Sequence, residues 1–129
     1  MPPIENLQRV PLYHLEGLER QGIFTTGLLL EVSETPTRRQ TLADQLNATP
    51  NDVSDWRDEA LLLNLANFGS DEQALFTQAG MVGLSDLLAV ELDDFRERLA
   101  RAARVLGIDP PTDLIVEGWW EQAHTLREE

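Results

Sequence analysis

The hexapeptide Leu18-Glu19-Arg20-Gln21-Gly22-Ile23 has a counterpart 58 positions later, Phe76-Thr77-Gln78-Ala79-Gly80-Met81. The two share the glycine and an apolar residue at each end. Each copy is followed by paired leucines, Leu29-Leu30 in the first and Leu87-Leu88 in the second. The tryptophan of each copy follows a proline and precedes an alanine, at Pro50, Trp56 and Ala60 and at Pro111, Trp119 and Ala123. This recurrence indicates a duplicated helical unit. A duplicated unit without catalytic residues favours a scaffold or recognition module.

The composition of the chain predicts one globular domain over residues 1–129, with a first repeat at about residues 7–60 and a second at about 61–127. The 129 residues include no cysteine, which excludes disulfides and thiolate metal sites. No apolar run approaches the roughly 20 residues that a membrane-spanning helix needs, and we expect a cytoplasmic protein that does not bind membranes.

The net charge of −13 is the strongest compositional signal, and all ten basic residues are arginines. Because nucleic-acid binders neutralise phosphates with basic side chains, this charge disfavours nucleic acid as a ligand. Two interpretations remain open. The acidity is an adaptation to habitat or solubility, or it forms a face that docks another protein with a basic surface.

Apolar residues recur at intervals of three and four, which predicts an all-α fold of eight or nine helices. Thr35-Pro36 and Thr49-Pro50 each place a capping residue before a proline, and both are expected to open helices. Ser70 with Gln73 has the spacing of a capping box. Asp93 is the expected cap of a helix that Gly107 ends, and Asp109-Pro110-Pro111-Thr112 is expected to start the last helix.

The region from Leu62 to Leu88 resembles a helix-hairpin-helix element, in which backbone N–H groups of a glycine-rich turn can hold a phosphate. Counting 13 residues back from each repeated glycine places a first hairpin turn at Arg9-Val10-Pro11 and a second at Asn67-Phe68-Gly69. Both lack the leading glycine, and Pro11 has no N–H to donate. Asp71 and Glu72 follow the second turn and would repel a phosphate. We therefore expect the fold without its DNA-binding function.

With these motifs in view, the chain resembles an uncharacterised bacterial family of duplicated helix-hairpin-helix-like domains, a domain of unknown function, over about residues 7–100. The resemblance is carried by Gly22-Ile23, Leu28-Leu29, Thr35-Pro36, Arg38-Arg39, Leu42-Ala43, Trp56 with Ala60 and Leu62, and the run from Leu75 to Gly80. It implies a compact bundle of two tandem helical repeats and no established activity. The chain departs from the family pattern in both hairpin turns and at Phe24 and Val82.

We predict the partner-binding residues from apolar side chains in unexpected places. Phe24 and Val82 occupy equivalent places in the two copies and could form a recognition patch, although each could instead pack beneath the next helix. Trp119 and Trp120 point about 100° apart on a helix, so one is expected in the core and the other partly exposed. The predicted apolar contacts are Phe24, Val82, Trp119 and Trp120, and the predicted acidic rim is Glu117, Glu121, Glu128 and Glu129.

A stripe of arginines is the place where nucleic acid would bind if it binds at all, and it comprises Arg96, Arg98, Arg101 and Arg104. The alternative is a solvated face held by ion pairs, because Glu97 precedes Arg101 by four residues. The carboxylate pairs Asp58-Glu59 and Asp93-Asp94 are expected at the surface of so acidic a chain.

No catalytic residue, metal site or cofactor is predicted. His14 and His124 lack metal-ligand spacing, and no serine lies in a Gly-x-Ser-x-Gly motif. We therefore predict a non-enzymatic, acidic protein-binding adaptor or assembly factor. The alternatives are a degenerate helix-hairpin-helix module that binds nucleic acid and a homodimeric structural protein closed through the C-terminal helix. The oligomeric state is left open.

Overall fold

The computed structural model describes residues 2–126, and this part of the chain contains eight α-helices, one 3₁₀ helix and no strand. The predicted all-α fold class is confirmed. Glu128 and Glu129 lie outside the described residues. In chain order the helices are η1 (Ile4–Asn6), α1 (Leu12–Arg20), α2 (Thr26–Val32), α3 (Pro36–Leu46), α4 (Pro50–Leu63), α5 (Ser70–Gln78), α6 (Leu84–Leu88), α7 (Leu92–Leu106) and α8 (Asp113–Leu126).

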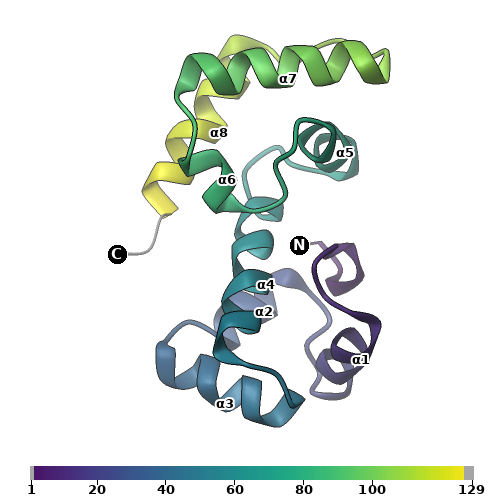
Figure 1. Ribbon diagram of the computed structural model, residues 1–129, viewed down its shortest axis with the longest axis vertical. Coiled ribbons are helices and arrows are strands. Elements are labelled where there is room, and N and C mark those ends of the chain that lie inside the picture. Colours follow the sequence, from purple (N-terminus) through teal and green to yellow (C-terminus); the bar gives the residue numbers. More distant parts are fainter. Residues whose placement is uncertain (1, 127–129) are drawn as a thin grey trace. The chain divides into compact units, whose positions relative to one another are not determined.

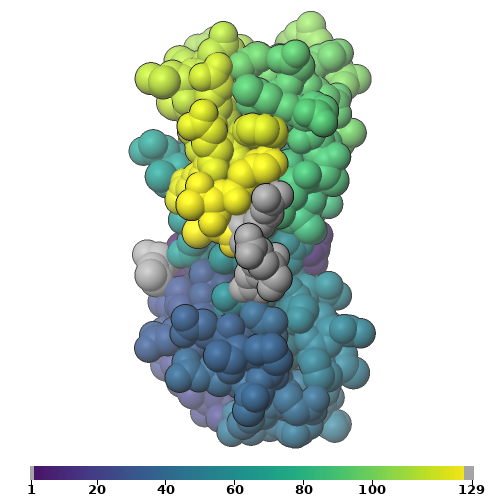
Figure 2. All heavy atoms as spheres, turned by 90° about the vertical axis from the view of Figure 1, so that its left-hand side faces the viewer, coloured from purple at the N-terminus to yellow at the C-terminus, as the bar shows by residue number. Residues whose placement is uncertain are grey.

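The chain divides into two compact units between Asn64 and Leu65. Unit 1 contains η1 and α1–α4, and unit 2 contains α5–α8 (Figure 1). In unit 1, α4 contacts α2 and α3, and α1 contacts α3. In unit 2, α8 contacts α6 and α7, and α5 contacts α7. Figure 2 shows the yellow surface of α8 beside the green surface of its own unit.

Two helices begin as the sequence predicts. Thr35 caps α3 by accepting a hydrogen bond from the N–H of Arg38, and Pro36 takes the first helical position. Thr49 caps α4 in the same way, and the carboxylate of Asp52 accepts the N–H of Thr49 in return, at 3.0 Å. Each cap satisfies backbone donors that have no partner within the helix.

The starts of α5 and α7 differ from the prediction. Gly69, not Ser70, is the N-cap of α5, because the carboxylate of Glu72 reaches back to the N–H of Gly69 at 2.9 Å. Glu91, not Asp93, precedes α7, and Asp93 lies in its first turn. An acid in the first turn is favourable beside the helix dipole, so its presence does not locate the cap.

The repeated glycines end α1 and α5 with the same backbone geometry. Gly22 and Gly80 both have φ of 81°. The next residue then donates back into the helix: Ile23 N–H to the carbonyl of Leu18 at 2.9 Å, and Met81 N–H to that of Phe76 at 2.8 Å. This is the Schellman arrangement, which favours glycine at the left-handed position. Gly107 ends α7 as predicted.

Each unit has an apolar core built from residues at matching places in the two halves of the chain. In unit 1 these buried residues include Leu18, Ile23, Leu29, Ala43, Val53, Trp56 and Ala60. In unit 2 they include Phe76, Met81, Leu87, Ala103, Val116, Trp119 and Ala123. Among the described residues, no helix has the length and apolar character needed to cross a membrane.

Replacement of either repeated glycine tests the shared turn. We expect Gly22→Ala and Gly80→Ala each to lower the free energy of unfolding by about 1 kcal/mol, because an L-residue is strained at this φ. A new Cβ would meet nothing within 4 Å, so the cost comes from the backbone alone.

Urea denaturation followed by circular dichroism measures this effect. Gly118→Ala is the matched control, since Gly118 lies within α8 and also has open space around it. Alanine should be neutral or stabilising there. Equal effects at all three positions would contradict the assignment.

Candidate functional site

The first predicted turn, Arg9-Val10-Pro11, is held at its start by a carboxylate of the same unit. Glu59, on α4, accepts the backbone N–H of Gln8 at 2.6 Å and that of Arg9 at 2.9 Å, one on each oxygen. The guanidinium of Arg9 in turn pairs with Asp58 at 3.1 Å. These donors come from a segment about 50 residues earlier in the chain. The start of this segment is thus held on α4 by two backbone N–H groups that donate to one carboxylate.

Glu59 is a buried carboxyl, with only 1% of its surface exposed. Burial raises its pKa above the ordinary value of 4.5, although the N–H groups of Gln8 and Arg9 and the charge of Arg9 act in the opposite direction. The prediction that Asp58-Glu59 is merely a surface pair is wrong for Glu59. Its position three residues after Trp56, on the core face of α4, is the sequence signal for burial.

The second predicted turn, Asn67-Phe68-Gly69, is bounded by hydrogen bonds at Ala66 and at Gly69. Gln122, on α8, accepts the N–H of Ala66 through its side-chain oxygen at 2.9 Å. Trp119 donates its indole N–H to the carbonyl of Ala66 at 2.8 Å. The carboxylate of Glu72 accepts a hydrogen bond from the N–H of Gly69. Gln122 follows Trp119 by three residues, as Glu59 follows Trp56, so the same place on the last helix of each unit holds the turn.

The predicted arginine stripe is largely neutralised within unit 2. Arg96 makes ion pairs with Asp93 at 3.0 Å, Glu117 at 3.1 Å and Asp113 at 3.3 Å. Arg98 pairs with Asp94 at 3.2 Å, and Arg101 lies 3.9 Å from Glu97. Arg104 is exposed at the end of α7. The geometry matches the expected salt-bridged face and leaves little positive charge for phosphates.

The adjacent tryptophans have different environments, as the helical period predicts. Trp119 is only 3% exposed and packs edge-to-face on Phe76, at 5.2 Å between ring centroids. The prediction that Trp119 contacts a partner is therefore corrected, because its ring lies in the core of unit 2. Trp120 is half-buried, and its ring packs at a tilt against that of His124, with 4.0 Å between ring centroids. Its indole N–H donates to the carbonyl of Val90 at 3.2 Å.

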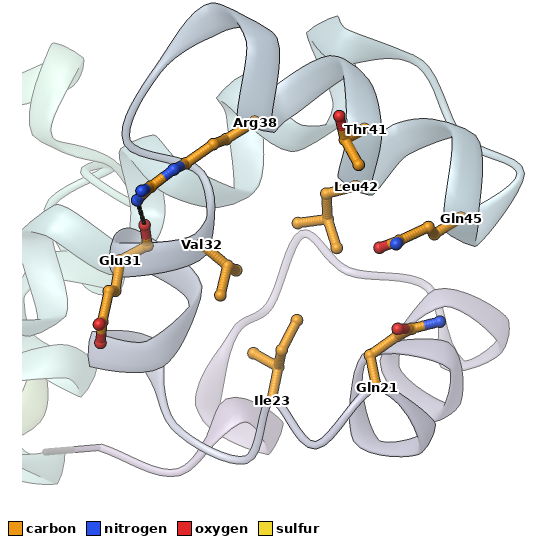
Figure 3. Close-up of a pocket in the computed structure, with 8 residues that line it drawn as sticks. All are labelled: Gln21, Ile23, Glu31, Val32, Arg38, Thr41, Leu42 and Gln45. Atoms are coloured by element: carbon orange, nitrogen blue, oxygen red, sulfur yellow. Dashed lines mark hydrogen bonds between the residues drawn. The ribbon is translucent and has the colours of Figure 1, made fainter.

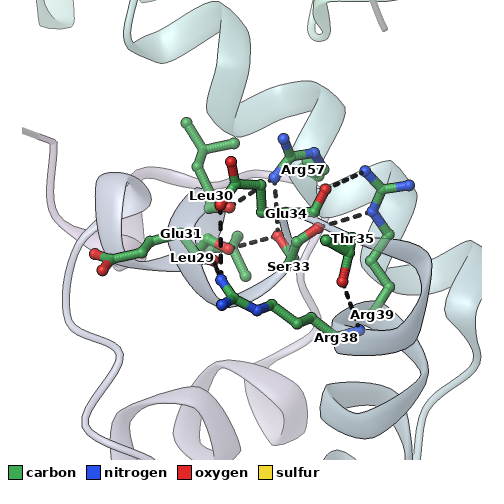
Figure 4. Close-up of polar contacts among 9 residues, drawn as sticks. All are labelled: Leu29, Leu30, Glu31, Ser33, Glu34, Thr35, Arg38, Arg39 and Arg57. Carbon is green, nitrogen blue, oxygen red and sulfur yellow. Dashed lines mark hydrogen bonds and ion pairs between the residues drawn. The ribbon is translucent and has the colours of Figure 1, made fainter. Parts of the chain in front are cut away.

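A corresponding contact in unit 1 belongs to a polar cluster at the end of α2 (Figure 4). Arg57 follows Trp56, as Trp120 follows Trp119, and donates to the carbonyl of Leu30 at 2.7 Å and to the hydroxyl of Ser33 at 3.2 Å. Arg39 donates to the carbonyl of Ser33 at 2.8 Å. These cations satisfy the carbonyls that a helix leaves open at its C-terminus.

The remaining predicted contacts lie in several places. Phe24 is 57% exposed, while its carbonyl accepts the N–H of Ile4. Val82 is half-buried, and its N–H donates to Asp86 at 2.9 Å. Glu117 is tied to Arg96, and Glu121 is exposed on α8. Phe24 and Glu121 are therefore available to a partner, but they belong to different units.

The structure also shows an exposed apolar group that the sequence analysis missed. Five large side chains are exposed within eleven residues, at the corner where α7 leads to α8: Val105 (69%), Leu106 (40%), Ile108 (47%), Leu114 (80%) and Ile115 (38%). We call them the α7–α8 corner. Val105-Leu106 and Leu114-Ile115 are adjacent pairs, which one core stripe of a helix cannot accommodate.

A pocket of about 380 Å³ lies in unit 1 between the end of α1, α2 and α3 (Figure 3). Its apolar lining comes from Ile23, Val32 and Leu42. Its polar lining is Gln21, Glu31, Arg38, Thr41 and Gln45. Its volume is near the lower end of the roughly 300–1,000 Å³ usual for ligand pockets. No group of three His, Asp or Glu side chains that could hold a metal occurs in residues 2–126.

The comparison with protein families assigns the chain to a family without a known activity. Residues 13–126 match the family described as a domain of unknown function, DUF4332, and the protein belongs to this family. The predicted membership of a family of unknown function is thus confirmed. No curated protein and no solved structure matches the chain.

The buried carboxyl predicts a pH dependence of stability. Because the folded-state pKa of Glu59 lies above its unfolded value, the folded state binds the proton more tightly. This contribution is fully present below about pH 4.5 and is lost as the pH rises through the folded-state pKa. We expect Glu59→Gln, which mimics Gln122 of unit 2, to remove it.

The measurement is urea unfolding of both proteins between about pH 4 and 7. The stability of the wild type relative to Glu59→Gln should decrease with rising pH. Parallel curves would show that Glu59 does not titrate differently in the folded protein.

The two tryptophans predict unequal costs of substitution. Trp120→Phe should lower the free energy of unfolding by about 1 kcal/mol, the typical value of one hydrogen bond. Trp119→Phe should cost more, because it also leaves a cavity in the core of unit 2. Thermal unfolding of the two matched variants measures both effects, and a larger cost for Trp120→Phe would contradict the assignment of core and edge.

Proposed function

We propose that this protein is a protein-binding adaptor that docks a basic partner on an acidic helical surface with an apolar centre. We further infer that its units are degenerate helix-hairpin-helix-like repeats. The recurrent Schellman turns at Gly22 and Gly80 support this inference. So do the backbone N–H groups that Glu59 and Gln122 accept at matching places in the two units.

The proposal rests above all on the α7–α8 corner. Val105 and Leu114 expose 69% and 80% of their surface. Monomeric soluble proteins rarely expose large contiguous apolar patches, and such patches commonly mark sites of protein interaction. The net charge of −13 then selects the partner, because long-range attraction favours a surface of opposite sign.

Nucleic-acid binding is less well supported. The N–H groups of Arg9 and Gly69 within the predicted turns, and of Gln8 and Ala66 beside them, already donate to side chains of the same unit. A phosphate would have to displace the Glu59 carboxylate from the first turn, in a chain whose net charge repels it. The Arg96 network offers no compensating positive face.

Affinity capture with corner variants tests the proposal. The double variant Val105→Ser/Leu114→Ser should lose the partners that the wild type captures from a native lysate. Leu12→Ser is the control, since Leu12 is 69% exposed, like Val105, but belongs to unit 1. Capture by the wild type should weaken between about 0.05 and 0.5 M salt, because exposed charges are screened. Mass spectrometry identifies the bound proteins.

Three results would contradict this function. One is capture that changes neither with salt nor with the corner variant. A second is retardation of a short DNA duplex that is lost on Arg101→Glu/Arg104→Glu, which would favour the nucleic-acid alternative. A third is self-association that strengthens with salt and is lost in the corner variant, which would identify a second copy of the chain as the occupant.

A further inference from the structure

The pocket of unit 1 contains polar groups that the fold does not use. The side-chain amides of Gln21 and Gln45 form no hydrogen bond with another described residue. Figure 3 shows them approaching the same end of the pocket from opposite sides, one from the turn after α1 and the other from α3. A primary amide both donates and accepts hydrogen bonds, so such a pair can bind a peptide group.

The charges around the pocket favour a cation. Arg38 donates to the carbonyl of Glu31 at 3.1 Å. It also lies 3.6 Å from the carboxylate of Glu34, which neutralises its positive charge. The Glu31 carboxylate has no ion pair with another described residue. The net negative charge of the chain adds to the preference for a positively charged ligand.

The second half of the chain shows that these polar residues are not required by the architecture. Counting 58 positions from Gln21 and Glu31 gives Ala79 and Ala89. By the same spacing Ile23 and Val32 correspond to Met81 and Val90, which remain apolar. The apolar residues that line the pocket therefore have apolar counterparts in unit 2. The side-chain amide of Gln21 and the carboxylate of Glu31 have no polar counterpart there. Gln21 and Glu31 are thus polar in unit 1 alone, and both are exposed, so a ligand can reach them.

We propose that this pocket binds an extended segment of a basic peptide. An aliphatic side chain enters between Ile23, Val32 and Leu42. The peptide groups beside it hydrogen-bond to the amides of Gln21 and Gln45. A neighbouring lysine or arginine of the peptide pairs with the carboxylate of Glu31. The choice of a peptide rests on the proposed protein-binding function. The pocket and the α7–α8 corner have no residue in common, so the two proposals can be tested independently.

The probe is the short peptide acetyl-Lys-Leu-Lys-amide, titrated into the isotope-labelled full chain and followed by NMR. We expect saturable shifts of the side-chain amide signals of Gln21 and Gln45 and of the Ile23 methyl groups. Acetyl-Lys-Ser-Lys-amide should bind about tenfold more weakly, because it lacks the aliphatic side chain. Acetyl-Glu-Leu-Glu-amide should also bind more weakly, since its charges oppose Glu31.

Matched variants separate the pocket from general binding to an acidic surface. Gln21→Ala/Gln45→Ala should abolish the saturable shifts, and unchanged signals elsewhere confirm that the variant is folded. Gln40→Ala should leave them intact, because Gln40 is the same residue type on α3 but does not line the pocket.

Four results would overturn the inference. These are no saturable shift in the wild type, equal binding of the acidic peptide, persistence of the shifts in the double variant, or shifts confined to unit 2. None of them bears on the α7–α8 corner, whose test uses different variants and a different readout.

Discussion

The hydrogen bonds from Gln8 and Arg9 to the buried carboxylate of Glu59 are the constraint on which unit 1 depends. They join the segment before α1 to the last helix of the unit, across about 50 residues of chain. Arg57, two residues before Glu59, binds the end of α2, so α4 holds both ends of the α1–α2 pair. In unit 2, Gln122 and Trp120 make the corresponding contacts with Ala66 and Val90. One helix organises each unit through a core tryptophan and two polar contacts.

These contacts are the reason why we do not expect the predicted turns to bind phosphate. Backbone amides bind anions only when they are free and the surrounding charge is favourable. Here a carboxylate and an amide of the same chain occupy them, and most of the arginines of α7 are paired with acids. The α7–α8 corner exposes apolar side chains, and the chain as a whole carries a net charge of −13. Those two properties are the basis of the proposal that the protein binds a basic partner.

Local features of the fold were predictable, whereas long-range ones were not. Thr35-Pro36, Thr49-Pro50 and the left-handed glycines act within one helical turn, so their sequence motifs suffice. The difference between Trp119 and Trp120 follows from helical periodicity alone.

The hydrogen bonds of Glu59 could not be predicted from the residues next to it in the sequence. Their donors lie in another segment, and an acidic side chain is ordinarily exposed. The α7–α8 corner was missed for the converse reason. Apolar side chains such as Leu106 and Leu114 are expected to be buried, and only the packing of the unit shows that they are not. The pocket depends on three helices meeting and has no local sequence motif.

Amide hydrogen exchange, resolved by residue, tests most directly whether side chains of each unit hold the backbone N–H groups at the two predicted turns. The amides of Gln8, Arg9 and Ala66 should exchange slowly in the wild type. In Glu59→Ala, those of Gln8 and Arg9 should become fast, while that of Ala66, which Gln122 holds, stays protected. Fast exchange of Gln8 and Arg9 in the wild type would contradict the account, because the amides would then be free to bind an anion.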